Sequence, residues 1–168
     1  MTLSETTVES PLGPLRLLAD EKGLRGLYYQ DHKNVPSLAS KTDGNHPVLT
    51  EARRQLEEYF SGERREFNLP LSLQGTPFML EVWEALDKIP FGTKVTYGQL
   101  AETIGRPKAS RAVGRANGLN PVSIVLPCHR VVGSNGKLTG YAGGLGNKDW
   151  LLRHEKETKT DRMVKGLI

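Results

Sequence analysis

Only one cysteine, Cys128, occurs in the chain, and this restricts the possible folds more than any other feature. A single thiol cannot form an intramolecular disulfide, and it cannot supply a structural zinc site built on several cysteines. The fold must therefore be stabilised by a hydrophobic core, for which 168 residues are enough, as one domain or two small ones. A lone cysteine is most often a small buried hydrophobic residue, so its neighbours must indicate whether it is reactive.

No segment of the sequence predicts membrane insertion or export. No apolar run approaches the roughly 20 residues that span a bilayer. The first ten residues hold two acids and no basic residue, which is unlike a signal peptide. A reducing compartment also suits the lone cysteine. We therefore expect a cytoplasmic protein without a membrane partner.

Positive charge is concentrated in the second part of the chain. Residues 1–72 carry nine Lys/Arg and eleven Asp/Glu, whereas residues 73–168 carry fourteen and eight. From Lys88 to Lys148 there are nine basic residues and one acid, Glu102. This bias favours a polyanionic partner. Nucleic acid is favoured over membrane because no basic helix with a large apolar face accompanies the charge.

The pattern of apolar residues predicts an α+β protein with two parts. Residues 1–73 are expected to form a small domain with a β-sheet and one helix. Apolar residues flank a turn at 20–23 and then recur at helical spacing from Leu49 to Phe60. Residues 74–168 are expected to form a mostly helical domain, whose first helix begins at the capping residue Thr76.

Two short helices joined by a glycine turn predict a helix-turn-helix in this second domain. Thr96 and Gln99 form a capping-box signature for the first helix, and Gly105 marks its end. The second helix is expected from Pro107 to Asn117. Many helical hairpins do not bind DNA, so the charge bias is what favours DNA in this case.

The second of these helices has a basic side and unusually small residues. At about 100° per residue, Lys108, Arg111 and Arg115 lie opposite its apolar side. Its small residues, among them Ala112 and Gly114, fit either tight helix packing or close approach to a narrow surface. The minor groove is about 6 Å wide, against about 12 Å for the major groove, so a helix needs a slim profile to lie against it.

The segment around Cys128 carries the candidate chemistry. An apolar strand is expected at 122–126, and a hairpin turn at 135–136 follows Cys128 and His129. The thiolate is the nucleophilic form of cysteine, so a neighbouring group must activate it, and we expect the pKa of Cys128 to be lowered. Neighbours on an extended chain point to opposite sides, so contact with His129 needs a turn or a bridging water. A third group such as Glu155 would orient the imidazole.

The motif Pro-Cys-His-Arg-Val-Val at 127–132 is similar to the active-site signature of the O6-alkylguanine-DNA alkyltransferases. The resemblance covers nearly the whole second part of the chain. Further blocks occur in the family's order at 75–78, 95–101, 111–114, 120–122, 141–144 and 150–155. The first 72 residues resemble the family's variable N-terminal domain more weakly, and residues 59–62 give the best local match there.

This resemblance implies roles for five residues in the chemistry. Cys128 would be the alkyl acceptor, His129 the base that takes its proton through a water, and Glu155 the residue that orients His129. Asn120 would brace the turn before the active-site strand. Tyr97 would donate a hydrogen bond to the flipped guanine.

The resemblance also implies the contacts with DNA. Arg111 would fill the place that the flipped base leaves, and the backbone carbonyls of Cys128 and Val131 would read the guanine amino group. The expected binding set is completed by Tyr97, Ala112, Gly114, Arg115, Tyr141 and Ala142. Some family members have serine in place of Ala142, so a hydroxyl contact is absent here, although a backbone N–H could replace it. Some also hold an N-terminal zinc through cysteines, which this chain lacks. No metal or cofactor is expected.

The implied function is direct DNA repair. An alkyl group, typically methyl, would move irreversibly and stoichiometrically from O6-alkylguanine, and also from O4-alkylthymine, to Cys128 after base flipping. The partner would be double-stranded DNA, bound through its minor groove by a monomer, with cooperative binding left open. Two alternatives are a protein that binds alkylated DNA without repairing it, and a Cys-His hydrolase. The thiol argues against the first, and the second would not explain the basic helix-turn-helix.

Overall fold

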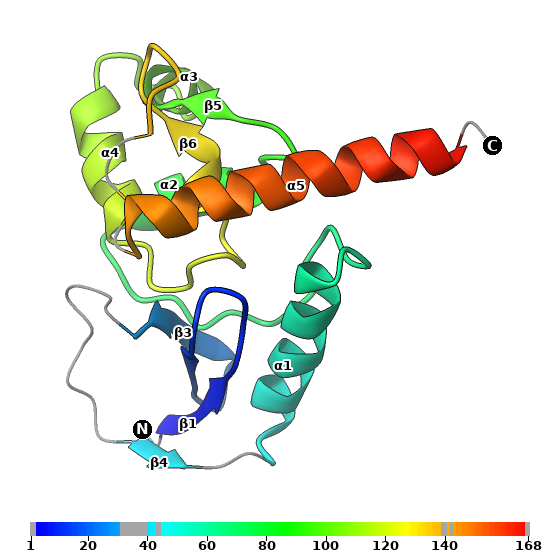
Figure 1. Ribbon diagram of the computed structural model, residues 1–168. Helices are drawn as coiled ribbons and strands as arrows, with labels where there is room; N and C mark the ends of the chain where they lie inside the picture. The colour runs from blue at the N-terminus through cyan, green and yellow to red at the C-terminus, as the bar shows by residue number, and fades with distance from the viewer. Residues whose placement is uncertain (1–2, 31–39, 43–44, 139–140, 142, 167–168) are drawn as a thin grey trace.

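The computed structural model describes residues 3–30, 40–42, 45–138, 141 and 143–166. It confirms an α+β architecture, with a small sheet in the first part of the chain and mostly helices in the second. In Figure 1 the sheet and helix α1 form the lower part, α2, α3 and α4 form the upper part, and the long helix α5 runs across between them.

The sheet has four strands in the order β3-β2-β1-β4. Its strands are β1 (Leu3–Val8), β2 (Leu15–Ala19), β3 (Leu24–Tyr29) and β4 (Ser40–Thr42). The predicted turn at 20–23 does join two antiparallel strands, β2 and β3, whereas β4 pairs with β1 in parallel. Helix α1 (Pro47–Phe60) packs on this sheet and is capped by Ser61, in agreement with the helical spacing predicted up to Phe60.

The second part contains α2 (Pro77–Asp87), β5 (Val95–Thr96), α3 (Tyr97–Thr103), α4 (Ser110–Gly118), the one-turn 3-10 helix η1 (Cys128–Arg130), β6 (Val131–Val132) and α5 (Leu145–Gly166). The Thr76 cap of α2 and the Thr96–Gln99 capping box of α3 are both formed. Helices α3 and α4 form the predicted helix-turn-helix, with Gly105 at a φ of +75° in the turn. Helix α4 begins at Ser110 rather than Pro107, because residues 106–109 form a separate turn closed by Ala109 N–H and Arg106 O.

The strand predicted at 122–126 is wrong, although the segment is buried as expected. The backbone turns back on itself, and its hydrogen bonds run from Val125 N–H to Ser123 O and from Leu126 N–H to Val122 O. Ile124 has a φ of +73°, the left-handed region that a β-branched residue rarely adopts. An apolar run therefore indicated burial correctly, but local turn geometry took the place of strand pairing.

The hairpin predicted at 135–136 is partly formed. Gly133 N–H donates to Lys137 O across a tight turn, but no return strand follows in residues 136–138. Strand β6 pairs in parallel with β5 instead, so it joins the start of the helix-turn-helix to the segment after Cys128. The return strand was expected to end at Tyr141, which is described and lies in no strand, while residues 139–140 lie outside the described residues.

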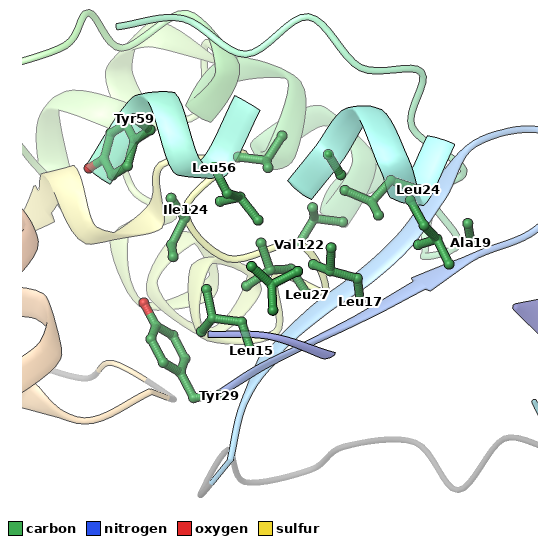
Figure 2. Packing of buried hydrophobic residues seen from close by; sticks show 14 of the residues in the cluster. Leu15, Leu17, Ala19, Leu24, Leu27, Tyr29, Leu56, Tyr59, Val122 and Ile124 are labelled. Carbon is green, nitrogen blue, oxygen red and sulfur yellow. The ribbon is translucent and has the colours of Figure 1, made fainter. Parts of the chain in front are cut away.

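Two clusters of buried hydrophobic residues form the core. The first combines the sheet and α1 with Val122, Ile124, Val125 and Leu151 from the second part of the chain. Figure 2 shows Val122 and Ile124 lying among the leucines of β2, β3 and α1. The second cluster joins α2, α3 and α4 to Leu126, Cys128 and Val131. The loop that carries Cys128 is thus held between both clusters.

Among the described residues, no helix combines the length and the apolar character needed to cross a membrane. Within the same part of the chain, no group of three or more His, Cys, Asp or Glu side chains is placed to hold a metal ion.

Candidate active site

Cys128 lies at the start of η1 and is only 4% exposed. The turn brings the sulfur near the side chains of Asn120 and Ser123, both of which favour the thiolate and so act to lower its pKa. Lys148 lies close enough for its positive charge to act on the sulfur. The chain is therefore not extended at Cys128 and His129, which meets one condition that the sequence set for reactivity.

The expectation of a lowered thiol pKa is wrong for the resting protein. Burial raises the pKa of Cys128, because the apolar surroundings disfavour the thiolate, and this effect exceeds all the others. The side chains of Asn120 and Ser123 and the charge of Lys148 act in the opposite direction. The resting form is consequently the neutral thiol, surrounded by groups that stabilise the anion once its proton is removed.

His129 is fully buried, and its Nε2 lies 2.7 Å from Oε2 of Glu155. A carboxylate can only accept, so Nε2 carries the hydrogen and Nδ1 holds the lone pair. Burial lowers the pKa of His129 despite the charge of Glu155, so the imidazole is neutral. Nδ1 is buried and makes no hydrogen bond to any described residue. A neutral imidazole with a fixed tautomer and an unused acceptor has the properties of a general base.

Glu155, on α5, is 1% exposed and accepts hydrogen bonds on both of its oxygens. Arg130 donates to Oε1 from Nε at 2.8 Å and to Oε2 from Nη2 at 3.0 Å. The backbone N–H of Gly92 and the hydroxyl of Tyr59 complete its partners. Burial raises the pKa of Glu155, but His129 and Arg130 outweigh it and hold this pKa well below its usual range. The carboxylate is therefore ionised and fixed in orientation.

Arg130, Tyr59 and Lys148 are site residues that the sequence reasoning missed. Arg130 belongs to the 127–132 motif and also donates to Ile89 O at 2.6 Å. Lys148 is fully buried, donates from Nζ to Val131 O at 2.6 Å, and has its pKa lowered by burial from 10.5 to about 8. Lys148, Leu151 and Glu155 recur at helical spacing, and this stripe could have predicted that both charged residues point inward.

Asn120 lies where the resemblance implied. Its Nδ2 donates to Leu126 O at 2.8 Å, and its Oδ1 accepts from Val122 N–H at 3.0 Å. These two bonds close the turn that contains Ile124 in its unusual conformation. The buried Asn117 adds a weaker bond from Nδ2 to Cys128 O at 3.4 Å.

The residues expected to contact DNA lie mainly on the helix-turn-helix. Arg111, Ala112 and Arg115 are exposed on α4. Gly114 is half-buried, and a methyl group added there would meet the Tyr97 ring at 3.6 Å. Tyr97 is half-buried at the start of α3 and packs against the cluster that contains Cys128. Tyr97 and the buried side of α4, with Val113 and Ala116, thus pack in the same cluster as Cys128, while the arginines of α4 are exposed.

Two of the remaining expected residues, Val131 and Tyr141, also belong to the cluster that contains Cys128 or pack against it. Val131 is fully buried, and its carbonyl already accepts from Lys148. Tyr141 packs against the cluster of Cys128, and its hydroxyl lies 2.6 Å from that of Tyr29 on β3. A side chain at Gly143 would overlap the Tyr29 ring, so this glycine permits the close approach. Ala142 lies outside the described residues.

A helix-turn-helix beside a buried cysteine with a histidine–glutamate pair defines the class of DNA alkyl-acceptor proteins. Comparisons with known proteins agree with this class. The family model "6-O-methylguanine DNA methyltransferase, DNA binding domain" matches residues 77–157, and the model "6-O-methylguanine DNA methyltransferase, ribonuclease-like domain" matches residues 3–73. The chain belongs to the methylated-DNA–protein-cysteine methyltransferase family.

Individual relatives match over most of their length. The methylated-DNA–protein-cysteine methyltransferase of Methanosarcina acetivorans is 50% identical over 147 residues, which are 88% of this chain and 94% of that protein. The Shigella flexneri protein of the same name is 44% identical over 165 residues, covering 92% and 96%. The crystal structure of Mycobacterium tuberculosis OGT in complex with DNA has a TM-score of 0.85 and 43% identity, and the match covers 94% of both chains.

Proposed function

We propose that this protein repairs DNA directly by moving an alkyl group from O6-alkylguanine onto Cys128. The observation that carries the proposal is the buried thiol beside a neutral His129, whose Nε2 is bound to Glu155 and whose Nδ1 makes no hydrogen bond within the described residues. DNA is the partner, in agreement with the names of the curated relatives and with the similar structure solved as a DNA complex.

The chemistry needs one proton transfer and one displacement. His129 Nδ1 takes the proton of Cys128 Sγ through a bridging water, and the thiolate attacks the alkyl carbon. The bond between this carbon and O6 breaks, its electron pair goes to the guanine, and the guanine then takes up a proton. Tyr97 donates a hydrogen bond to the leaving base, whose developing negative charge such a bond stabilises. Burial keeps both Cys128 and His129 neutral until the substrate is present.

Access to O6 requires base flipping, because this atom lies inside the stacked duplex. Flipping costs a few kcal/mol, which Arg111 offsets by stacking in the vacated place. Helix α4 lies against the minor groove, where Ala112 and Gly114 allow close approach and Arg115 contacts a phosphate. Residues 1–73 and 74–168 act as two domains, a division supported by the limits of the two matching family models. O4-alkylthymine is a second substrate.

The product, S-alkyl cysteine, is a thioether without a good leaving group, so the protein acts once. Two other functions give different results with methylated DNA. A binding protein would leave the thiol unmodified, and a Cys-His hydrolase would turn over repeatedly. The monomeric state and the cytoplasmic location stay predictions.

Intact-mass spectrometry after mixing with O6-methylguanine DNA tests the proposal. We expect one added methyl group, located at Cys128 by peptide mapping, and one repaired guanine per protein. The variant Cys128→Ser is the control and should gain no mass. An unchanged mass of the unaltered protein would support the binding protein, and product beyond one equivalent would support the hydrolase.

A further inference from the structure

Tyr59 is a buried tyrosine that the N-terminal part of the chain places against the alkyl-transfer site. It lies in the last turn of α1 and is fully buried, with its ring centroid 5.4 Å from that of Phe67, 6.2 Å from Phe91 and 5.3 Å from His154. Figure 2 shows it at the end of α1, at the edge of the cluster that contains Leu56 and Ile124. Its hydroxyl donates to Oε2 of Glu155 at 2.6 Å.

The direction of this hydrogen bond is fixed by chemistry. The ionised Glu155 has no proton to give, so the tyrosine must be the donor. Burial raises the pKa of Tyr59 well above its ordinary value, and the negative charge of Glu155 raises it further. The hydroxyl therefore keeps its proton across the physiological range. A short bond from a neutral donor to a buried carboxylate belongs to the stronger class of hydrogen bonds.

The position of Tyr59 is fixed a second time through its backbone. Its carbonyl oxygen lies 2.7 Å from Nε2 of His154, and a carbonyl can only accept, so His154 donates. Helix α1 is thus tied to α5 at two consecutive residues, His154 through the backbone of Tyr59 and Glu155 through its hydroxyl. Such a double connection sets the place of the hydroxyl independently of ring packing.

We infer that Tyr59 is a positioning residue for alkyl transfer, through which the N-terminal part of the chain holds Glu155 as the partner of His129. The inference rests on the proposed function, since it assigns to His129 the role of base. One oxygen, Oε2, accepts from Tyr59 at 2.6 Å, from His129 at 2.7 Å and from Arg130 at 3.0 Å. Tyr59 approaches from α1, whereas Arg130 follows His129 directly in η1.

Sharing this oxygen limits how strongly Glu155 attracts the proton of His129. Among the charged groups that face His129, Glu155 raises its pKa, while Arg130 and Lys148 lower it, and Cys128 lies next to it in the chain. Removing the Tyr59 hydroxyl leaves more negative charge on Oε2 for the imidazole. His129 is then protonated at a higher pH, and a protonated imidazole cannot act as a base.

The variant Tyr59→Phe removes the hydroxyl and keeps the ring. We expect its single-turnover rate at neutral pH to fall roughly tenfold, the lower end of the effect of losing an outer partner of a functional side chain. The acid limb of the rate–pH profile should also move to higher pH, while the Kd for DNA is unchanged. Tyr28→Phe is the matched control, because it removes a hydroxyl from a buried tyrosine on β3 whose pKa is influenced by Arg25 and Arg16.

A fall in rate with an unmoved acid limb would mean that Tyr59 only supports the fold, and this result overturns the inference, as does an unchanged rate. Failure of the unaltered protein to methylate Cys128 would refute the proposed function instead. In that case an NMR titration of the His129 ring, in the unaltered protein and in Tyr59→Phe, tests whether Tyr59 influences His129 without relying on alkyl transfer. A raised pKa of His129 in Tyr59→Phe supports the influence of Tyr59 on His129 through Glu155, and an equal pKa in the two proteins refutes it.

Discussion

The ionisable side chains around Cys128 are buried and hydrogen-bonded, whereas those on α4 are exposed to solvent. His129, Arg130, Lys148 and Glu155 are each at most 5% exposed, and each has at least one hydrogen-bond partner. On α4, Arg111 and Arg115 are exposed. Burial strengthens electrostatic interactions and fixes protonation states, while exposure gives a salt-sensitive attraction for a polyanion. The comparison indicates that chemistry and DNA binding can be changed separately.

The largest difference between the effect on alkyl transfer and the effect on DNA binding is expected for Cys128→Ser. Serine keeps the size of the side chain but supplies no thiolate, so alkyl transfer should be abolished completely. The exposed face of α4 is unchanged, so the Kd for DNA should equal that of the unaltered protein. Gel-shift titration and a methyl-transfer assay on the same preparation measure both quantities. A loss of DNA binding in this variant would break the comparison between the two regions.

The next largest effect is expected for Glu155→Gln, in stability as well as in rate. A neutral amide leaves Arg130 buried without its counter-charge, which costs about 3–5 kcal/mol in comparable buried pairs. The folded pKa of Glu155 lies below its ordinary value. The stabilisation from the carboxylate is therefore present above the unfolded pKa of about 4.3 and is lost as pH falls.

Urea denaturation as a function of pH tests this sign. The unaltered protein should lose more free energy of unfolding on acidification than Glu155→Gln, so the two curves converge at low pH. A constant difference between the curves would show that Glu155 does not titrate with folding. His129→Ala serves as a control, because it should slow alkyl transfer while Arg130 keeps its partner.

A smaller effect, which depends on the substrate, is expected for Arg111→Ala. If Arg111 stacks in the vacated place, its loss should slow repair of duplex DNA and matter less for mismatched or single-stranded DNA, where less flipping work remains. Arg115→Ala should weaken binding equally for all substrates and reduce the salt slope of log K by about one. Equal fractional losses for Arg111→Ala on all three substrates would make it a simple phosphate contact.

The smallest effect is expected for Gly114→Ala, which sharpens the comparison within α4. The added methyl meets the Tyr97 ring at 3.6 Å, an ordinary contact, so no strain arises. Alanine should stabilise the helix by roughly 0.5–1 kcal/mol relative to glycine. If α4 lies close against DNA, binding should nevertheless weaken modestly. Thermal denaturation and gel-shift titration measure these opposite changes, and unchanged binding would mean that the backbone does not approach DNA at Gly114.

Features with local causes could be predicted from the sequence. The caps at Thr76 and Thr96, the turn between β2 and β3 and the end of α1 at Phe60 all depend on residues a few positions apart. The exposed basic face of α4 follows from helical periodicity alone. The candidate site residues Cys128, His129, Asn120 and Glu155 were predicted from the family motifs, and the structure brings their side chains together.

Features that depend on packing between distant segments could not be predicted. Tyr59 meets Glu155 across 96 positions, and Arg130 meets it across 25. The raised pKa of Cys128 has the same origin, because desolvation depends on every segment that covers the sulfur. The incorrect strand at 122–126 shows the limit of apolar patterning, since a buried turn and a buried strand bury the same residues.

The first hydrophobic cluster also has a consequence for how the chain is made. Phe91, Val122, Ile124, Val125 and Leu151 complete a core whose other buried members belong to the sheet and α1. During synthesis the sheet and α1 leave the ribosome first, and at that moment part of their apolar surface has nothing to cover it. The core of the N-terminal part is complete only when α5 has been made. A chain that ends before Leu151 leaves apolar surface of the first cluster uncovered, and it also lacks Glu155, the partner of His129. Synthesis of α5 therefore completes the first core, through Leu151, and the reactive centre, through Glu155, in the same step.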